Sequence, residues 1–497
     1  MIRASGPTLT SPAVLLAAAF GAVFAAALYP VWGLEGRWFV IVLVAIGLVS
    51  VSMMFAGRFS DFLLVVLLFC VPLAGFTKWL GLEAYPEDVR LAMPISGTLG
   101  LGITDFLVAG MYLAWGWRIF VMREERLPRL ERLDGWVGLL LLASALSLWG
   151  SQDLRLGVFA FEHLVKHALV YFYVSRHLRR DHLPWLAAAI AAAILLEGVL
   201  GVLQYREILP PGLILDKGAG SERLEYQYLV PGIEDVNRAT GTTYDSHSLG
   251  IYLAMLLPYA VAFLYRQALP ARVRLGWGAL LVLGTAALVF SYSRSAWLSF
   301  GIAALITVAV LVAWRDRHVA VSAAGMAFVA ILSAPWVFAR VFERFFTAPK
   351  GTLTVRFDQF PIAWDMWRDN FLFGSGAGNY MLELNQHNMN WAFDVPVHNV
   401  PLFIGAELGL FGVVVYYGLI LAAMRRLWGA VRERDEPVSR FALAAFAGLP
   451  AYVFDGMSDP LFRESVVYMM FWITVALGVA LPRIARAGRA AGRGAAP

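Results

Sequence analysis

The residues of this chain best suited to chemistry stand where polar segments run into hydrophobic ones. His398 and Asn399 directly precede the apolar run PLFIGAELGLFG, and Arg238 and Arg294 each stand close to the start of another apolar run. A histidine in such a place can titrate near neutral pH. A guanidinium matches the oxygen atoms of a phosphate through paired hydrogen bonds. These residues indicate chemistry on a phosphorylated substrate, provided that the fold brings them together.

The composition indicates a membrane protein. The chain has 497 residues, 60% of them hydrophobic and 15% charged, with a mean hydropathy of +0.67. A soluble domain has about 25% charged residues. Apolar runs of about twenty residues, enough to cross a bilayer core, recur along the chain. The single cysteine, Cys70, excludes an intrachain disulfide, and the net charge of +5 is no sign of nucleic-acid binding.

The hydropathy pattern predicts an all-α, polytopic fold of about fourteen spans. An outer-membrane barrel would instead show short alternating segments. The expected spans are 12–29, 37–57, 60–79, 99–117, 134–150, 156–175, 184–204, 247–265, 275–292, 295–314, 319–338, 398–424, 441–455 and 465–482.

The distribution of arginine predicts the orientation. With the N-terminus in the cytoplasm, the cytoplasmic loops and the tail carry more than half of the 40 lysine and arginine residues, as the positive-inside rule requires. Both termini are then cytoplasmic, and two long loops are extracytoplasmic. The predicted regions are an N-terminal transmembrane bundle (1–204), a first loop (205–246), central transmembrane helices (247–338), a large loop (339–397), and C-terminal helices with a tail (398–497).

The large loop contains a predicted helix and a turn. Phe357, Phe360, Trp364 and Trp367 recur at helical spacing, which suits either a helix at the membrane interface or packing on the neighbouring spans. The glycine-rich segment GSGAGNY follows. No P-loop lysine accompanies it, so a plain turn is favoured over a phosphate-binding loop.

The orientation puts Arg238, Arg294 and His398 at the same membrane face. Two guanidinium groups beside helix N-termini suit a diphosphate. At the outer surface, this suggests a polyprenyl-diphosphate-linked sugar, whose diphosphate is also the leaving group. Fixed positive charge would stabilise the transition state, and neutral His398 is a candidate base for the acceptor hydroxyl. Glu407, predicted inside the same helix as Asn399, needs a partner at that depth, and arginine is the natural one.

Three segments resemble the O-antigen ligase and O-antigen polymerase superfamily of bacterial envelope glycosyltransferases. They are NRATGTTYDSHSLGIYL, YSRSAWLSF, and RFDQFPIAWDMWRDNFLFGSGAGNY followed by VHNVPLFIGAELGLFG. The third is the most specific. The chain departs from the family pattern at Ser246-His247, where Pro-Asn is usual, and it has more spans than the twelve associated with the ligases.

The resemblance implies a GT-C-like fold and a metal-independent, inverting transfer of a glycan from undecaprenyl diphosphate at the periplasmic face of the inner membrane, with no cofactor. The acceptor is another lipid-linked glycan for a polymerase, or lipid A-core or a similar molecule for a ligase. Arg238 and Arg294 would bind the diphosphate and His398 would act on the acceptor or phosphate, with His247 as the rival base. The expected substrate-binding set is Arg238, Arg294, Asn399, Glu407, His247 and Arg356.

Two other kinds of function are open from the sequence. A lipid-glycan transporter or flippase would use the polar cluster of span 156–175, which contains Glu162, His163, Lys166 and His167; a Glu162–Lys166 pair facing the bundle is the simpler interpretation. A scaffold without chemistry would tolerate loss of His398. The acidic residues Asp455, Asp459 and Glu464 lack a histidine and regular spacing, so no metal site is predicted.

Overall fold

A computed structural model describes most of the chain beyond residue 58. The described residues are 59–75, 77–80, 99–210, 238–243, 245–314, 350–386, 396–433, 435–460 and 464–494. The predicted spans 12–29, 37–57 and 319–338 lie outside them, so the total of fourteen spans stays a prediction.

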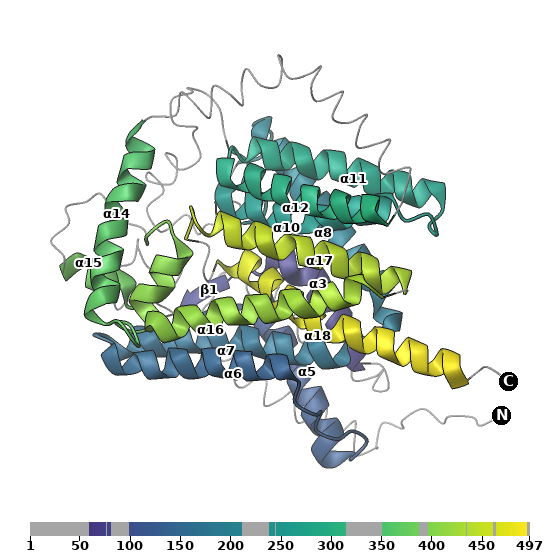
Figure 1. Ribbon diagram of the computed structural model, residues 1–497, viewed down its shortest axis with the longest axis horizontal. Helices are drawn as coiled ribbons and strands as arrows, with labels where there is room; N and C mark the ends of the chain where they lie inside the picture. The colour runs from purple at the N-terminus through teal and green to yellow at the C-terminus, as the bar shows by residue number, and fades with distance from the viewer. Residues whose placement is uncertain are drawn as a thin grey trace.

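Helices make up almost all of the described structure (Figure 1). The first half contains α3 (Phe59–Cys70), η2 (Val71–Leu73), β1 (Thr77–Leu80), β2 (Leu99–Gly102), α5 (Ile103–Gly116), η4 (Trp117–Val121), α6 (Arg132–Ser147), η5 (Leu148–Gly150), α7 (Leu154–His177), η6 (Arg180–His182) and α8 (Leu183–Tyr205). The second half contains α10 (Ser246–Leu264), α11 (Ala271–Phe290), α12 (Arg294–Ala313), α14 (Lys350–Asp369), α15 (Tyr380–Gln386), α16 (Val400–Val431), α17 (Glu436–Asp455) and α18 (Ser465–Gly494).

Within the described residues, eight helices are long and apolar enough to cross a membrane: α6, α8, α10, α11, α12, α16, α17 and α18. The apolar α3–η2 segment is shorter, and α7 is long but carries charged residues in its middle. The all-α membrane fold predicted from hydropathy is therefore confirmed.

Two predicted spans are partly wrong in their bounds. The span predicted at 60–79 ends its helical part at Leu73, and the one predicted at 99–117 begins with a strand. β1 and β2 pair antiparallel, with Thr77 opposite Gly102. Gly100 and Gly102 lower the helix propensity of the second segment, and pairing supplies the backbone hydrogen bonds that a helix would otherwise make.

The core of the bundle lies around α10. This helix contacts α11, α12 and α17, and nearly all of its residues are buried. The outer helices differ, since Leu305 of α12 and Val282 of α11 are about seven-tenths exposed at 70% and 72%. Isolated apolar side chains on the outside of a bundle this hydrophobic are suited to contact lipid.

The predicted helix of the large loop is present as α14, and it stands across one end of the bundle (Figure 1). Phe357 and Trp364 are exposed, whereas Gln359 is buried. The glycine-rich segment that follows is a turn, as predicted, with positive φ at Gly374, Gly376 and Gly378.

The chain after α14 is tied to a break in α16. The break is at Gly409, whose φ of +67° is outside the helical region and suits glycine. The N–H of Leu410 donates to the carbonyl of Phe371 at 2.8 Å, and the N–H of Gly376 donates to that of Glu407 at 3.1 Å. The break thus exposes backbone groups that anchor the end of α14.

Candidate functional site

Arg238 is buried against the C-terminal end of α11. Its Nε donates to the carbonyl oxygen of Ser291 at 3.0 Å, and the N–H of Ala239 donates to the carbonyl of Phe290 at 2.9 Å. Only 7% of Arg238 is exposed. The last carbonyls of a helix lack partners within it and favour a cation. The end of α11 therefore fixes the position of the guanidinium.

A tight reversal joins α11 to α12 and carries Arg294. Tyr292 has a φ of +52°, a conformation that is uncommon outside glycine. Ser293 caps α12, its side chain accepting from the N–H of Ala296 at 3.4 Å. Arg294 is the first residue of α12 and is half-buried. The reversal thus places Arg294 shortly after the carbonyl of Ser291 that Arg238 contacts.

His247 links Arg238 to a buried carboxylate. Its Nε2 lies 3.3 Å from Nη2 of Arg238, and its Nδ1 lies 3.1 Å from Oγ of Ser293 and 3.3 Å from Oδ2 of Asp459. A guanidinium only donates, so Nε2 accepts and Nδ1 carries the proton of the neutral ring. Asp459 is 1% exposed and also accepts from Ser295 Oγ at 2.8 Å. His247 therefore positions Arg238 in this arrangement.

His398 is held by Gln359 of α14. The Oε1 atom of Gln359 lies 3.2 Å from the backbone nitrogen of His398 and 2.9 Å from its Nδ1. The backbone N–H can only donate, so this oxygen is an acceptor and Nδ1 must also donate to it. The lone pair of the neutral imidazole is then on Nε2. Gln359 thereby selects the tautomer in which Nε2 can accept a proton.

Asn399 connects His398 to the arginine cluster. Its side chain caps α16 by accepting from the N–H of Leu402 at 3.0 Å, and its Nδ2 donates to the carbonyl of Met457 at 3.2 Å. Met457 belongs to the turn after α17 that also contains Asp459, the partner of His247. The structure therefore brings His398 and Asn399 to the same end of the bundle as Arg238, His247 and Arg294.

Two predicted binding residues have a different status. Glu407 is fully buried in α16, directly before the break, and its backbone carbonyl accepts from Gly376. Arg356 lies in α14, but its side chain is outside the described part of the structure. Their roles in binding stay predictions.

A protonated carboxyl is expected at Glu464, which directly precedes α18. It is 7% exposed, and its Oε2 accepts from the N–H of Val467 at 2.8 Å. Burial raises the pKa of Glu464 to about 8; the Val467 N–H opposes this shift, and the negative charge of Asp245 adds to it. Asp245 caps α10 and lies two residues before His247. Glu464 is therefore largely neutral at pH 7.

Glu464→Gln should make protein stability less dependent on pH. Because its pKa is higher in the folded protein than the ordinary value of 4.5, the wild-type contribution is fully present below 4.5 and is lost as pH rises through about 8. In detergent, the Tm of the wild type should fall by several degrees more than that of Glu464→Gln between about pH 5 and about pH 9. Parallel Tm curves for the two proteins would contradict this assignment.

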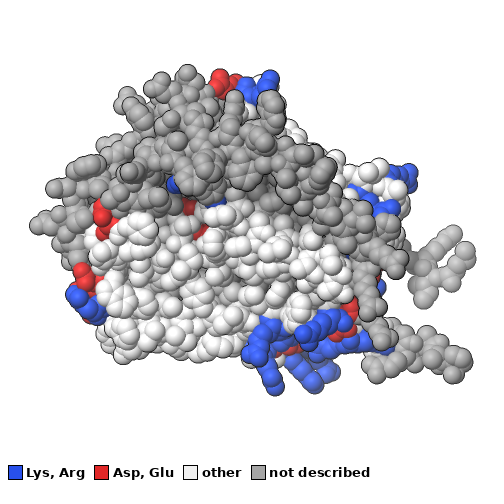
Figure 2. Space-filling model, turned by 45° about the horizontal axis from the view of Figure 1, so that its top comes forward, with Lys and Arg blue, Asp and Glu red and all other residues white. Residues whose placement is uncertain are grey.

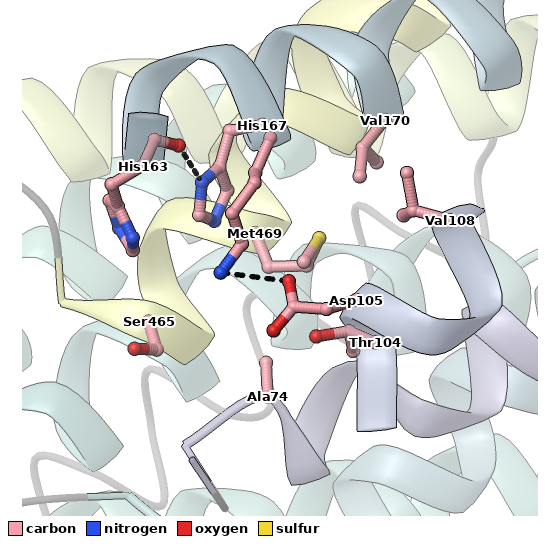
Figure 3. A pocket seen from close by; sticks show the side chains of 10 residues that line it. Ala74, Thr104, Asp105, Val108, His163, His167, Val170, Ser465 and Met469 are labelled. Carbon is pink, nitrogen blue, oxygen red and sulfur yellow. Dashed lines mark hydrogen bonds and ion pairs between the residues drawn. The ribbon is translucent and has the colours of Figure 1, made fainter. Parts of the chain in front are cut away.

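The polar residues of α7 form a separate cluster around a small cavity between α5, α7 and α18. Lys166 Nζ lies 2.8 Å from Oδ1 of Asp105 and 3.9 Å from Glu162. Its nearer partner is therefore on α5, and the Glu162 pair predicted from the sequence is the longer of the two. Figure 3 shows the Nδ1 of His167 facing the carbonyl of His163, at 2.8 Å, with Asp105 across the cavity. Lys166 is thus balanced by two carboxylates.

Within the described residues, no group of three or more histidine, cysteine or acidic side chains could hold a metal ion. The acidic residues near the site have other contacts. Asp459 accepts from Ser295 and faces His247, and Asp455 lies 3.5 Å from Oγ of Ser299. These two carboxylates therefore serve in packing and orientation in this structure.

Residues 279–417 match the sequence profile of a family described as O-Antigen ligase (Wzy_C). Over this segment the chain is similar to the O-antigen ligase family. The resemblance to the O-antigen ligase and polymerase superfamily is thereby confirmed. No curated protein matches the chain.

The O-antigen ligase match runs from α11 into α16. It contains Arg294, Gln359 and His398, whereas Arg238 and His247 precede it. Arg238 is therefore positioned both by Ser291, inside the matched segment, and by His247, outside it.

Two residues of the candidate site were not predicted from the sequence. Gln359 lies in the predicted helix of the large loop and was given no role, and Asp459 was considered only for a metal site, which was not predicted. A buried glutamine on a helix with exposed aromatic residues gives no sequence signal of its own. Asp459 had one usable signal: an acid that follows a span on the same face as His247.

Proposed function

We propose that this protein transfers a glycan from an undecaprenyl-diphosphate-linked donor to an acceptor hydroxyl at the periplasmic face of the bacterial inner membrane. Family membership supports glycan transfer of the O-antigen ligase or polymerase type. The observation that carries the specific proposal is the convergence of Arg238, His247, Arg294 and His398 from four separate elements at one end of the bundle.

The proposed diphosphate site is formed by Arg238, Arg294 and the start of α12. Arg238 is held through Nε by Ser291 and through Nη2 by His247, so its guanidinium is oriented before substrate arrives. The N-terminus of α12 adds a partial positive charge. As the bond between C1 of the sugar and the diphosphate oxygen breaks, negative charge grows on the leaving diphosphate. Oriented cations stabilise that charge more than they stabilise the bound donor.

The proposed base is His398. Its Nε2 takes the proton of the acceptor hydroxyl as that oxygen attacks C1 of the donor sugar from the face opposite the diphosphate. One C–O bond forms and one breaks, so the configuration at C1 inverts. The proton stays on the imidazolium of His398, and the electron pair of the broken C1–O bond leaves with the diphosphate. His247 keeps its positioning role because its Nε2 accepts from Arg238.

Changing Gln359 should alter the pH profile without removing the base. Gln359→Glu puts a carboxylate beside Nδ1, which favours the imidazolium and should shift the acidic limb of the kcat profile upward by about one pH unit. Gln359→Leu removes the tautomer preference and should lower kcat by about tenfold. Rates of glycan transfer across pH measure both effects. An unchanged limb in Gln359→Glu would separate Gln359 from the catalytic histidine.

Reconstitution with a polyprenyl-diphosphate oligosaccharide tests the function. Product is resolved on a gel with and without lipid A-core. A ladder that forms without core identifies a polymerase, and product that requires core identifies a ligase. Absence of transfer to both acceptors by folded wild-type protein would overturn the proposal for that donor. Addition of EDTA should leave the rate unchanged.

A lipid-glycan transporter is the alternative, and the α7 cluster separates the two. A transporter requires Lys166 and tolerates Arg294→Ala. Glycan transfer requires Arg294 and depends on Lys166 only through the fold, because Lys166 is held between Asp105 and Glu162. Loss of function in cells for Lys166→Met with normal stability, beside a functional Arg294→Ala, would favour the transporter.

A further inference from the structure

A cavity of about 400 Å³ lies at the end of the bundle opposite the candidate site. It is lined by the C-terminal ends of α5 and α7, the middle of α18, and the segment between η4 and α6. Five arginines and two glutamates contribute to its walls: Arg126, Arg129, Arg176, Arg179, Arg483, Glu125 and Glu131. The cavity is therefore strongly basic, and it shares no residue with the proposed transfer site.

Two of the cavity arginines and both of its glutamates are already engaged in ion pairs. Arg176 is paired with Asp134 and Arg179 with Asp61. Glu131 lies 2.9 Å from Nη2 of Arg426. Each of these ion pairs has one partner outside the cavity wall. The pairs therefore do not neutralise the charges of the other cavity arginines.

Three cavity arginines are left without an acidic partner among the described residues. Arg126 and Arg129 make no ion pair there. Arg483 donates from Nη2 to the carbonyl of Leu178 at 2.6 Å, while its buried Nε has no hydrogen-bond partner in the described part of the chain. A buried donor without a partner is costly. An anion in the cavity would supply the missing acceptor.

The position of the cavity matches a membrane interface. α18 begins at Ser465, close to the turn that contains Asp459, and its residue Arg483 lies in the cavity wall. Eighteen residues of helix span about 27 Å, close to the roughly 30 Å of a bilayer hydrocarbon core. Beside the cavity, Phe120 and Leu130 are 73% and 83% exposed. Figure 2 shows basic side chains gathered at one end of the molecule, next to a broad uncharged surface.

We propose that this cavity binds the phosphate group of an anionic membrane lipid. Arginines match phosphate oxygens through paired hydrogen bonds, and basic pockets between transmembrane helices suit anionic headgroups. The exposed side chains of Phe120 and Leu130 beside the cavity would contact the acyl chains of a lipid whose headgroup lies in it. The same cavity chemistry would accept a soluble phosphate, and the test separates these two sources. The proposal does not depend on glycan transfer.

The test compares delipidated wild type with Arg126→Gln/Arg129→Gln, and uses Arg272→Gln as a matched control. Arg272 is an exposed arginine on the first turn of α11, whose other end is at the transfer site, so it lies at the same end as the cavity but outside it. Tm is measured in detergent with phosphatidylglycerol, with phosphatidylcholine, and with glycerol phosphate. Native mass spectrometry counts the lipids retained.

Phosphatidylglycerol should raise the wild-type Tm by several degrees and be retained by the intact protein. The double variant should lose most of that rise while keeping the wild-type Tm without lipid, and Arg272→Gln should behave as wild type. An equal rise with phosphatidylcholine, or an equal loss in Arg272→Gln, would overturn the site. An equal rise with glycerol phosphate would overturn the lipid as its occupant.

Discussion

His398→Ala is expected to lower kcat for glycan transfer by about 10²–10⁴-fold, the usual contribution of a positioned general base. The structure supplies the reason, because Gln359 accepts from Nδ1 and leaves the proton-accepting lone pair on Nε2. The proposed diphosphate site is formed by Arg238 and Arg294, so KM for the lipid-linked glycan should change little. Initial rates with varied donor and with varied acceptor measure both quantities.

His247→Gln is the informative comparison for that result. His247 contacts Arg238 and Asp459, so its loss should raise KM for the donor more than it lowers kcat. If His247→Gln abolished kcat while His398→Ala remained active with an unchanged pH profile, the roles proposed for the two histidines would be reversed. Tm in detergent shows whether either variant is misfolded.

Arg238→Ala is expected to lower kcat/KM by about 10²–10³-fold, the cost of losing one oriented group that stabilises developing negative charge. Arg238→Lys should recover only part of this loss, since an ammonium cannot bind two oxygens in a fixed fork. Donor titration with purified protein separates weakened binding from a slower chemical step.

Arg155→Ala is a suitable control for Arg238→Ala. Arg155 is an exposed arginine at the start of α7, on the same predicted side of the membrane. It should keep nearly full activity. Equal losses in both variants would show that general positive charge, and not the oriented guanidinium, supports the reaction. Full activity of folded Arg238→Ala would remove Arg238 from the proposed diphosphate site.

The fold was largely predictable because lipid imposes a strong and simple rule on the sequence. A helix that crosses the bilayer must be apolar for about twenty residues, so α10, α11 and α12 were visible as runs with polar ends. The β1–β2 pair was not visible. Its backbone partners are separated by a stretch of chain, and the glycines near β2 favour several conformations equally.

The grouping of the candidate residues was predictable where such a residue lies at a helix end. Arg238, Arg294 and His398 could be assigned to one face from topology alone. Their partners could not, because contacts between side chains depend on how helices pack. Gln359 meets His398 only because α14 crosses the start of α16, and Asp459 meets His247 only because the turn after α17 approaches α10.

The break in α16 anchors the chain just after α14, so the number of residues from Phe371 back to Gln359 sets where Gln359 lies relative to His398. One end of this segment is anchored where Phe371 bonds to Leu410 beside Gly409, and Gln359 lies near the middle of the helix. Each residue of an α-helix turns the next by about 100°. Inserting a single residue between Gln359 and Phe371 would therefore rotate the glutamine away from His398 while leaving every residue of the site unchanged. The orientation of His398 therefore depends on the number of residues in this segment as well as on their identity.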